Sequence, residues 1–521
     1  PGTGGTAPVY GHALGHATYE RHRPEQTLLY QLIERHWPEL QSHLREVGSF
    51  LPQHVTREFE EYLICGCLEH GFLRVRCEGC RHENLVAFSC KRRGFCPSCG
   101  ARRMAETAAL LVDDVLPHKP IRQWVLSFPY PLRFLLAHNP QAVSNVLGIV
   151  NRAISTHLVK KAGLKKATAH TGAATLVQRS GSALNLNLHF HILFIDGAYK
   201  CRNNGKLKFH RTNAPTNNEL NALVAAISQR VARHLERQGL LARDDESSYL
   251  SLDLQEDDAM NQIQGNSITY RIAVGPHQGR KVFTLQTIPS WEDDFDNNQA
   301  GKVAGFSLHA GVATKTRERR KLERLCRYIA RPAVSEKRLA LTSHGKVRYE
   351  LKTPYRDGTT HVIFEPLDFI AKLAALVPRP RANLTRYHGV LAPNSKHRVN
   401  VTPAKRGKDS SRQGLQGKNS AESPAEEHRA MTWAQRLKRV FNIDITICSR
   451  CGRAAKIIAS IEDPLVIKRI LDHLDTKAVA PVSTNHLPEP RAPPQASFFD
   501  YNRESDDNSR SRKRLAGPPV A

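Results

Sequence analysis

The sequence predicts an α+β fold in which a cysteine-rich N-terminal domain precedes a mixed α/β domain and a partly disordered C-terminal tail. Three observations lead to this prediction. Five cysteines fall between Cys77 and Cys99. Apolar and polar residues alternate along 184–195, as in a strand with one buried face. The chain after Pro481 is rich in Pro, Ser and Arg, a composition typical of disorder.

Composition narrows the class of protein further. A chain of 521 residues suggests two to four domains, and 40% hydrophobic residues exclude global disorder. No run of 18 apolar residues occurs, which argues against a membrane-spanning helix. The 76 Lys and Arg exceed the 49 Asp and Glu by 27, an excess that favours a polyanionic partner such as nucleic acid. A basic protein with a merely solvated surface is the alternative.

Changes in composition and periodicity predict seven segments. Strands are expected at 124–128, 174–178 and 184–195, and helices at 143–159 and 367–376. Residues 241–300 hold 11 acidic and 4 basic side chains, so we expect an insertion that faces away from any DNA site. The segments are an N-terminal helical part (1–64), a cysteine-rich domain (65–110), the α/β domain (115–335), its basic C-terminal part (336–398), a linker (399–430), a small helical unit (431–475) and the tail (476–521).

The clustered cysteines predict a structural zinc site. No apolar segment typical of a secretory signal lies near residue 1, so we expect a reducing compartment, where such cysteines are metal ligands. Cys77-x2-Cys80 and Cys96-x2-Cys99, 15 residues apart, match the four-cysteine zinc spacing. Four thiolates leave no open position on the ion. Cys90 is a spare fifth candidate, and a chance group of buried thiols is the alternative.

Basic residues flank the second cysteine pair and predict contacts with DNA phosphates. These are Arg92, Arg93, Arg102 and Arg103. Another pair, Cys448-x2-Cys451, offers only two ligands, which do not close a tetrahedron. By itself it predicts only half of a metal site.

The segment LNLNLHFHILFI (184–195) predicts a second metal site. Its alternation places His189 and His191 on one face, where both rings can converge on one ion. A site of two imidazoles with oxygen ligands suits magnesium or manganese bound to a phosphate. Gln178, at the end of the neighbouring strand, is the favoured third ligand, and Asp196 is the other candidate. A structural histidine pair is the alternative.

A basic helix is predicted over 315–332, ended by Pro332. Leu322, Leu325, Cys326 and Ile329 would form its buried stripe, with Tyr328 on the flank. The alternative is a tyrosine at a helix end with its hydroxyl in water. The basic residues expected near Tyr328 are Arg317, Lys321, Arg324 and Arg331, and a second basic patch holds Arg379, Arg381 and Arg386, interleaved with Tyr387.

Together these features resemble the rolling-circle insertion-sequence transposases of the IS91 type, including the common-region (ISCR) elements. The residues that carry the resemblance are FSCKRRGFCPSCGARRMAE (88–106), RQWVLSFPYPLRF (122–134), LNLNLHFHILFIDGAY (184–199), LCRYIARPAVSEKRL (325–339) and LVPRPRANLTRYHGVLAPNSKHR (376–398).

The resemblance implies an HUH-type α/β nuclease domain with a central antiparallel sheet. In that class His189 and His191 bind a divalent metal that polarises the scissile phosphate, and a tyrosine attacks it to give a 5′-phosphotyrosine and a free 3′-hydroxyl. Tyr328 corresponds to that nucleophile. Some members carry a second tyrosine four residues earlier, where this chain has Arg324, so it resembles the single-tyrosine branch.

The implied function is a transposase that nicks and rejoins single-stranded DNA at insertion-sequence ends. Zinc would be structural and magnesium or manganese catalytic. The expected partners are single-stranded DNA at the element termini and target, and a host helicase, with no membrane, in a bacterial cytoplasm near the nucleoid. The alternatives are a plasmid or phage replication initiator of the same class and a non-catalytic zinc-containing DNA-binding protein. Conjugative relaxases usually place the tyrosine before the histidines, unlike this chain. If Tyr328 is not the nucleophile, Tyr387 or Tyr199 is next.

Overall fold

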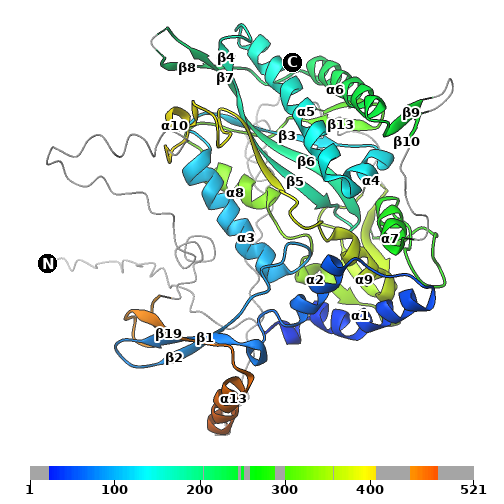
Figure 1. The fold of residues 1–521 in the computed structure, drawn as a ribbon, viewed down its shortest axis with the longest axis vertical. Coiled ribbons are helices and arrows are strands. Elements are labelled where there is room, and N and C mark those ends of the chain that lie inside the picture. The colour runs from blue at the N-terminus through cyan, green and yellow to red at the C-terminus, as the bar shows by residue number, and fades with distance from the viewer. Residues whose placement is uncertain are drawn as a thin grey trace, which may run out of the picture. The chain divides into compact units, whose positions relative to one another are not determined.

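Figure 1 shows the computed structural model, which describes residues 23–203, 205–243, 248–250, 258–287, 300–355, 357–405 and 446–478. The chain divides into two compact units. Unit 1 comprises residues 1–23, 65–88 and 429–489, and unit 2 comprises residues 24–64, 89–428 and 490–521. Residues 1–22, most of the predicted linker, the tail beyond 478 and every acidic residue of 241–300 except Asp258 lie outside the described residues.

Unit 1 joins two distant parts of the chain in one antiparallel sheet. Strand β1 (Phe72–Cys77) pairs with β2 (Glu83–Ala87) on one side and with β19 (Ala455–Ile461) on the other. A short 3₁₀ turn, η2 (Leu68–His70), precedes β1, and α13 (Pro464–Ala478) follows β19. The segment predicted as a small helical unit (431–475) therefore also supplies a strand, β19. The backbone of this strand pairs with the edge of β1 that β2 leaves open.

Unit 2 is built on a seven-stranded antiparallel sheet, which confirms the predicted α+β fold with a central antiparallel sheet. The strand order is β12-β13-β3-β6-β5-β18, and β14 also pairs with β3. The strands are β3 (Ile121–Ser127), β5 (Gly172–Ser180), β6 (Leu186–Ile195), β12 (Ala300–Val303), β13 (Phe306–His309), β14 (Ala313–Thr314) and β18 (Thr385–Gly389).

Helices cover both faces of this sheet. On one face, α4 (Tyr130–His138), α5 (Pro140–Lys161) and α6 (Asn217–Arg237) bury the even-numbered side chains of β6, such as Phe190 and Ile192. On the other, α8 (Arg319–Ile329) and a π-helical turn, η3 (Leu110–Val115), pack on the odd-numbered Leu193 and Ile195. Successive strand side chains point to opposite faces, so the face that carries His189 and His191 is the one covered by α8.

The remaining elements of unit 2 surround this sandwich (Figure 1). A four-stranded sheet has the order β11-β17-β16-β15, a three-stranded sheet the order β4-β7-β8, and β9 pairs with β10. These strands are β4 (Ala169–His170), β7 (Gly197–Cys201), β8 (Leu207–Arg211), β9 (Leu241–Arg243), β10 (Ser248–Leu250), β11 (Phe283–Gln286), β15 (Leu339–Leu341), β16 (Val347–Glu350) and β17 (Thr359–Phe364). The helices are α1 (Leu28–Glu46), α2 (Gln53–Leu63), α3 (Pro97–Ala109), α7 (Ala259–Ile268), α9 (Pro366–Leu376) and α10 (Arg398–Val401), with the 3₁₀ turns η1 (Pro24–Gln26) and η4 (Glu336–Arg338).

Three expectations about this unit can be compared with the structure. The predicted strands at 124–128, 174–178 and 184–195 and the helices at 143–159 and 367–376 all form, within a few residues at each end. The helix predicted from residue 315 begins later, at Arg319. The orientation of the acidic insertion relative to DNA stays a prediction; within it, the hydroxyl of Ser267 in α7 accepts the backbone N–H of Leu186 at the start of β6. None of the helices among the described residues is long and apolar enough to cross a membrane.

A buried ion pair links the central strand β3 to the end of β6. Arg122 donates two hydrogen bonds to the carboxylate of Asp196, at 3.0 and 2.9 Å, and a third to the carbonyl of Ala310. The side chains of Arg122 and Asp196 are only 8% and 4% exposed. Asp196 therefore neutralises a buried guanidinium and is not available as a metal ligand.

Asp196→Ala is expected to lower the free energy of unfolding by about 3–5 kcal/mol, because it leaves the charge of Arg122 buried and unpaired. Urea denaturation followed by tryptophan fluorescence measures this loss. The control is Asp472→Ala in α13, whose partner Lys468 is 72% exposed, and which should cost less than about 1 kcal/mol. Equal effects of the two substitutions would contradict this assignment.

Candidate functional site

The register of three strands brings the predicted metal ligands together. His189 of β6 is the Cα partner of Gln178 in β5 and of Ser127 in β3. His191 lies two residues further along the same face. The pair is therefore in the middle of the sheet rather than at its edge, and His191 is only 6% exposed.

Three donor atoms converge at this point. The Nε2 atoms of His189 and His191 are 3.1 Å apart, and the side-chain oxygen Oε1 of Gln178 is 3.1 Å from the Nε2 of His191. Two imidazole nitrogens and an amide oxygen face one another here, and atoms of these kinds can coordinate a divalent metal. The structure thus brings together the three residues predicted from the sequence, and their role as metal ligands stays a prediction.

Hydrogen bonds around the rings define their tautomers in the absence of a metal. The Nδ1 of His189 lies 2.7 Å from the carbonyl of Asn187, so this nitrogen donates and the Nε2 keeps a free lone pair. We therefore assign the hydrogen between the rings to the Nε2 of His191. The Nδ1 of His191 then accepts from the side-chain amide of Gln123, 2.6 Å away.

Both imidazoles are held neutral, the form that binds metals. Burial lowers the pKa of His189 to about 4, and nearby Arg331 and Arg133 act in the same direction. Burial, followed by the proximity of His189 and Arg331, brings the pKa of His191 well below its usual range. At neutral pH no proton charge competes with a cation.

Gln123, which lies in a segment (122–134) that carried the family resemblance but which no motif singled out, is expected to position His191. For the Nε2 of His191 to face a cation, its hydrogen must move to Nδ1, and Gln123 must turn its amide to accept it. Gln123→Leu is expected to weaken Mn²⁺ binding by about 10–100-fold, because leucine accepts no hydrogen bond. Gln123→Glu should bind Mn²⁺ at least as tightly as the parent protein, since a carboxylate favours a hydrogen on Nδ1. Calorimetric titration measures both affinities.

Gln141→Leu, on the exposed start of α5, is the matched control and should leave the Mn²⁺ affinity unchanged. Unaltered affinity in Gln123→Leu would rule out the positioning role.

Gln178 also connects the histidines to the helix that carries Tyr328. Its amide nitrogen donates to the carbonyl of Ile329, the residue after Tyr328 and the last of α8. The amide oxygen faces His191, so a single side chain spans from the histidine pair to the end of α8. The buried stripe of α8 is the predicted one, Leu322, Leu325, Cys326 and Ile329.

Two cations contact the ring of Tyr328. The guanidinium of Arg331 is 4.1 Å from the ring centroid, and the ammonium of Lys352 is 4.0 Å from it. Arg331 is also close enough to both histidines to lower their pKa values. A half-buried phenol near two positive charges is in a setting that favours a bound phosphate.

The other tyrosines considered in the sequence are in different surroundings. Tyr199 is 5% exposed, and burial raises its pKa to about 12. Tyr387 lies in β18 opposite Ala174, and burial raises its pKa as well. Both phenols are harder to ionise than an exposed one, which weakens them as alternative nucleophiles.

The cysteines do not form the predicted single group. Cys77 and Cys80 lie in unit 1, where they cluster with Cys448 and Cys451. The second cluster contains Cys90, Cys96 and Cys99, which lie in unit 2.

Within each group the sulfur atoms lie within 4.8 Å of one another. The expectation of one tetrahedron from Cys77, Cys80, Cys96 and Cys99 is therefore wrong. The spacing between two pairs does not say which pairs meet, because that depends on tertiary contacts.

The basic residues next to Cys90 are largely engaged in local structure. Arg92 pairs with Glu61 of α2, and Arg93 donates to the carbonyl of Ala382. Arg103 donates to the carbonyls of Lys91 and Arg92. Arg102 pairs with Glu106.

The remaining predicted contacts differ in exposure. Arg324, Arg379 and Arg381 are exposed. Lys321 pairs weakly with Glu318, and Arg386 donates to Ser144. Arg317 precedes α8, which begins at Arg319, and so it is not on the face of that helix. It lies in a turn in which the Glu318 carboxylate accepts the backbone N–H of Lys315.

Two basic segments meet at one pocket of about 170 Å³ in unit 2. Its lining comes from α2, from the segment before Cys96 and from the chain after α9: His54, Glu58, Lys91, Arg92, Arg93, Pro378 and Pro380. Arg379, between the two prolines, is close enough to help lower the pKa of His54, after burial. The sequence predicts the basic segment before Cys96 and the one around Arg379 as two separate patches.

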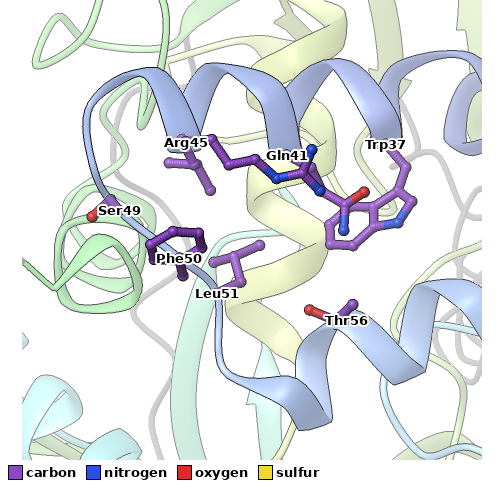
Figure 2. A pocket seen from close by; sticks show the side chains of 8 residues that line it. Trp37, Gln41, Arg45, Ser49, Phe50, Leu51 and Thr56 are labelled. Atoms are coloured by element: carbon purple, nitrogen blue, oxygen red, sulfur yellow. The ribbon is translucent and has the colours of Figure 1, made fainter.

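A smaller pocket, of about 80 Å³, lies between the end of α1 and the start of α2 (Figure 2). Trp37, Leu51 and Phe50 supply much of its wall, and Arg45 is the one charged residue of its lining. None of the predicted site residues contributes to it, so it does not belong to the candidate site.

Two residues besides Gln123 were missed by sequence reasoning. Arg133 of α4 helps to lower the pKa of His189, and Lys352 contacts Tyr328. Gln123 and Arg133 both lie in a segment (122–134) that carried the family resemblance, which was a usable signal. Lys352 lies just after β16 of the four-stranded sheet, and only the tertiary structure brings it to Tyr328.

Comparisons with known proteins agree with this description. Residues 172–398 match the Y2_Tnp family, described as "Putative transposase", and residues 32–128 match the transposase zinc-binding domain of the IS91 type. No curated protein matches the chain, and no solved structure does.

Proposed function

Because the chain belongs to the IS91-type transposases, we propose that it nicks and rejoins single-stranded DNA at the ends of an insertion sequence, with Tyr328 as the nucleophile. As a transposase with a zinc-binding domain it acts on DNA. The finer proposal concerns the chemistry and the residues that perform it. A 5′-phosphotyrosine would link the enzyme to the cut strand until the 3′-hydroxyl of another strand displaces it.

One observation carries the proposal: the side chain of Gln178 touches both His191 and the carbonyl next to Tyr328. These two contacts support a cation site and the phenol of Tyr328 in one region of the molecule. Cleavage by a tyrosine needs both at a single phosphate, because the nucleophile must be in line with the leaving oxygen.

The donor set fits a divalent cation, with His189, His191 and Gln178 as its protein ligands. Such an ion would supply charge stabilisation at a non-bridging phosphate oxygen. The protein residues perform the remaining tasks. Arg331 and Lys352 offer positive charge beside the phenol, and Gln123 orients His191.

The covalent step balances without an external energy source. The phenol oxygen of Tyr328 forms a bond to phosphorus while the bond from phosphorus to the 3′-oxygen breaks, and the phenolic proton ends on that oxygen. The phosphodiester is exchanged, not lost. Arg324 stands four residues before Tyr328, so a mechanism that alternates two tyrosines at these positions is not part of the proposal.

The DNA strand is proposed to pass along the basic pocket that contains Arg92 and Arg93 and along exposed Arg324, Arg379 and Arg381. The separate segments that meet at this pocket support the proposal, since a strand contacts several phosphates at once. Arg102, Arg103, Arg317, Lys321, Arg331 and Arg386 are secondary candidates for phosphate contact. The host helicase that would open the duplex remains part of the proposal, as does action in a bacterial cytoplasm.

Single-stranded oligonucleotides that carry each element end, incubated with the protein and Mn²⁺, test the proposal. A 3′-labelled strand should migrate with the protein on a denaturing gel, while a 5′-labelled strand should yield a shorter fragment that a polymerase can extend. Cleavage of replication-origin sequences alone would favour the replication initiator. Absence of any covalent product with both ends would favour a non-catalytic DNA-binding protein.

A further inference from the structure

Two copies of the same backbone turn face each other in unit 1, although they come from opposite ends of the chain, with Cys80 and Cys448 separated by 368 positions. The first is Cys77-Glu-Gly-Cys80 at the end of β1, and the second is Cys448-Ser-Arg-Cys451 before β19. In each turn the first sulfur accepts a backbone N–H from two residues later, that of Gly79 at 3.3 Å and that of Arg450 at 3.4 Å.

The match between the turns extends beyond these bonds. The N–H of the first cysteine donates to the carbonyl five residues later in both, His82 at 2.9 Å and Arg453 at 2.8 Å. The residue after the second cysteine is left-handed in both, Arg81 with φ 56° and Gly452 with φ 70°. A non-glycine residue rarely adopts this conformation, so the turn at Arg81 is held by its surroundings.

The four sulfur atoms lie at distances suited to a shared ion. Cys77 Sγ is 3.4 Å from Cys451 Sγ, and Cys80 Sγ is 3.5 Å from Cys448 Sγ. A disulfide would need about 2.05 Å. Tetrahedral zinc with Zn–S bonds of about 2.3 Å separates its sulfurs by about 3.8 Å, and all four atoms here are within 4.8 Å of one another.

We propose that Cys77, Cys80, Cys448 and Cys451 bind a zinc ion that fastens the C-terminal segment to the N-terminal strands. The β1–β19 ladder runs directly from this cluster, with Cys77 opposite Ala455, and the backbone N–H of Glu78 donates to the carbonyl of Ala454. The ion stabilises the pairing of β1 with β19, two strands that are far apart in the chain. Closing so long a loop by backbone hydrogen bonds alone costs conformational entropy, which the free energy of metal binding offsets. The matched zinc-binding domain ends at residue 128 and does not include half of these ligands.

Metal content of the purified full-length protein, measured by mass spectrometry without chelator, tests the proposal. Cys448→Ser/Cys451→Ser and Cys77→Ser/Cys80→Ser should each lose one zinc per chain, and the quadruple variant should also lose only one. Cys96→Ser/Cys99→Ser, combined with Cys448→Ser/Cys451→Ser, should lose two. Cys201→Ser, outside both clusters, is the control and should lose none.

Full zinc content in Cys448→Ser/Cys451→Ser, a loss of two ions in the quadruple variant, or iron in place of zinc would overturn the proposal. Hydrogen exchange gives a second readout that does not depend on yield or DNA cleavage. Cys77→Ser/Cys80→Ser should speed exchange at residues 455–461, far along the chain, whereas Cys201→Ser should not. Unchanged exchange there would show that no ion holds β19 in place.

Discussion

Tyr328→Phe is expected to abolish the covalent protein–DNA product and to lower the rate of strand cleavage by at least about 10³-fold. Phenylalanine keeps the ring in contact with Arg331 and Lys352 but removes the oxygen that would attack phosphorus. Because the substitution leaves the cationic surroundings intact, binding of single-stranded DNA should change little. Denaturing gels with 3′-labelled oligonucleotide measure the product, and fluorescence anisotropy measures binding.

Tyr387→Phe is the matched control for this prediction. Tyr387 is half-buried in β18 of the main sheet, next to Arg398, and its replacement should leave covalent product formation in place. A covalent product that persists in Tyr328→Phe and disappears in Tyr387→Phe would transfer the nucleophilic role to Tyr387.

His191→Ala is expected to lower the cleavage rate by about 10³-fold or more and to remove measurable Mn²⁺ binding. It deletes the donor that faces both His189 and Gln178, so two isolated ligands remain. The Tyr328 phenol and the basic pocket stay in place, and DNA binding without metal should be preserved. Calorimetry with Mn²⁺ and single-turnover cleavage measure the two effects separately.

Gln178→Glu separates the two contacts of that side chain. A carboxylate keeps a metal-binding oxygen toward His191, so Mn²⁺ affinity should be retained. The same carboxylate cannot donate to the carbonyl of Ile329, so cleavage should fall by about 10-fold or more through misplacement of the end of α8. If Gln178→Glu loses neither property, the bridge between histidines and helix has no role in positioning.

Several parts of the candidate site could be predicted from local sequence because one strand contains them. The alternation from Leu184 to Ile195 is enough to place His189 and His191 on the same face, since strand side chains alternate strictly. The short connection from β5 to β6 limits the register to a few possibilities, and Gln178 is opposite His189 in the register that forms. The position of Tyr328 on its helix could be predicted for a similar reason, because the apolar stripe beside it is buried as its periodicity predicts.

Residues that meet from unrelated elements could not be predicted in this way. Gln123, Arg133 and Lys352 reach the histidines or Tyr328 from β3, α4 and the chain after β16. No residue spacing in the sequence predicts these contacts. Arg317 shows the opposite error, since counting helical turns placed it on a helix that begins two residues later.

The sequence by itself determined the kinds of ligand, the shared face of the histidine pair and the family, because these depend on residue identity and on periods of two and 3.6 residues. Only the tertiary structure decided which cysteines belong together, and that Cys448 and Cys451 complete the group of Cys77 and Cys80. Metal ligands are grouped by distance in space, and the pairing of β1 with β19, in which Cys77 lies opposite Ala455, overrides the nearer partners along the chain.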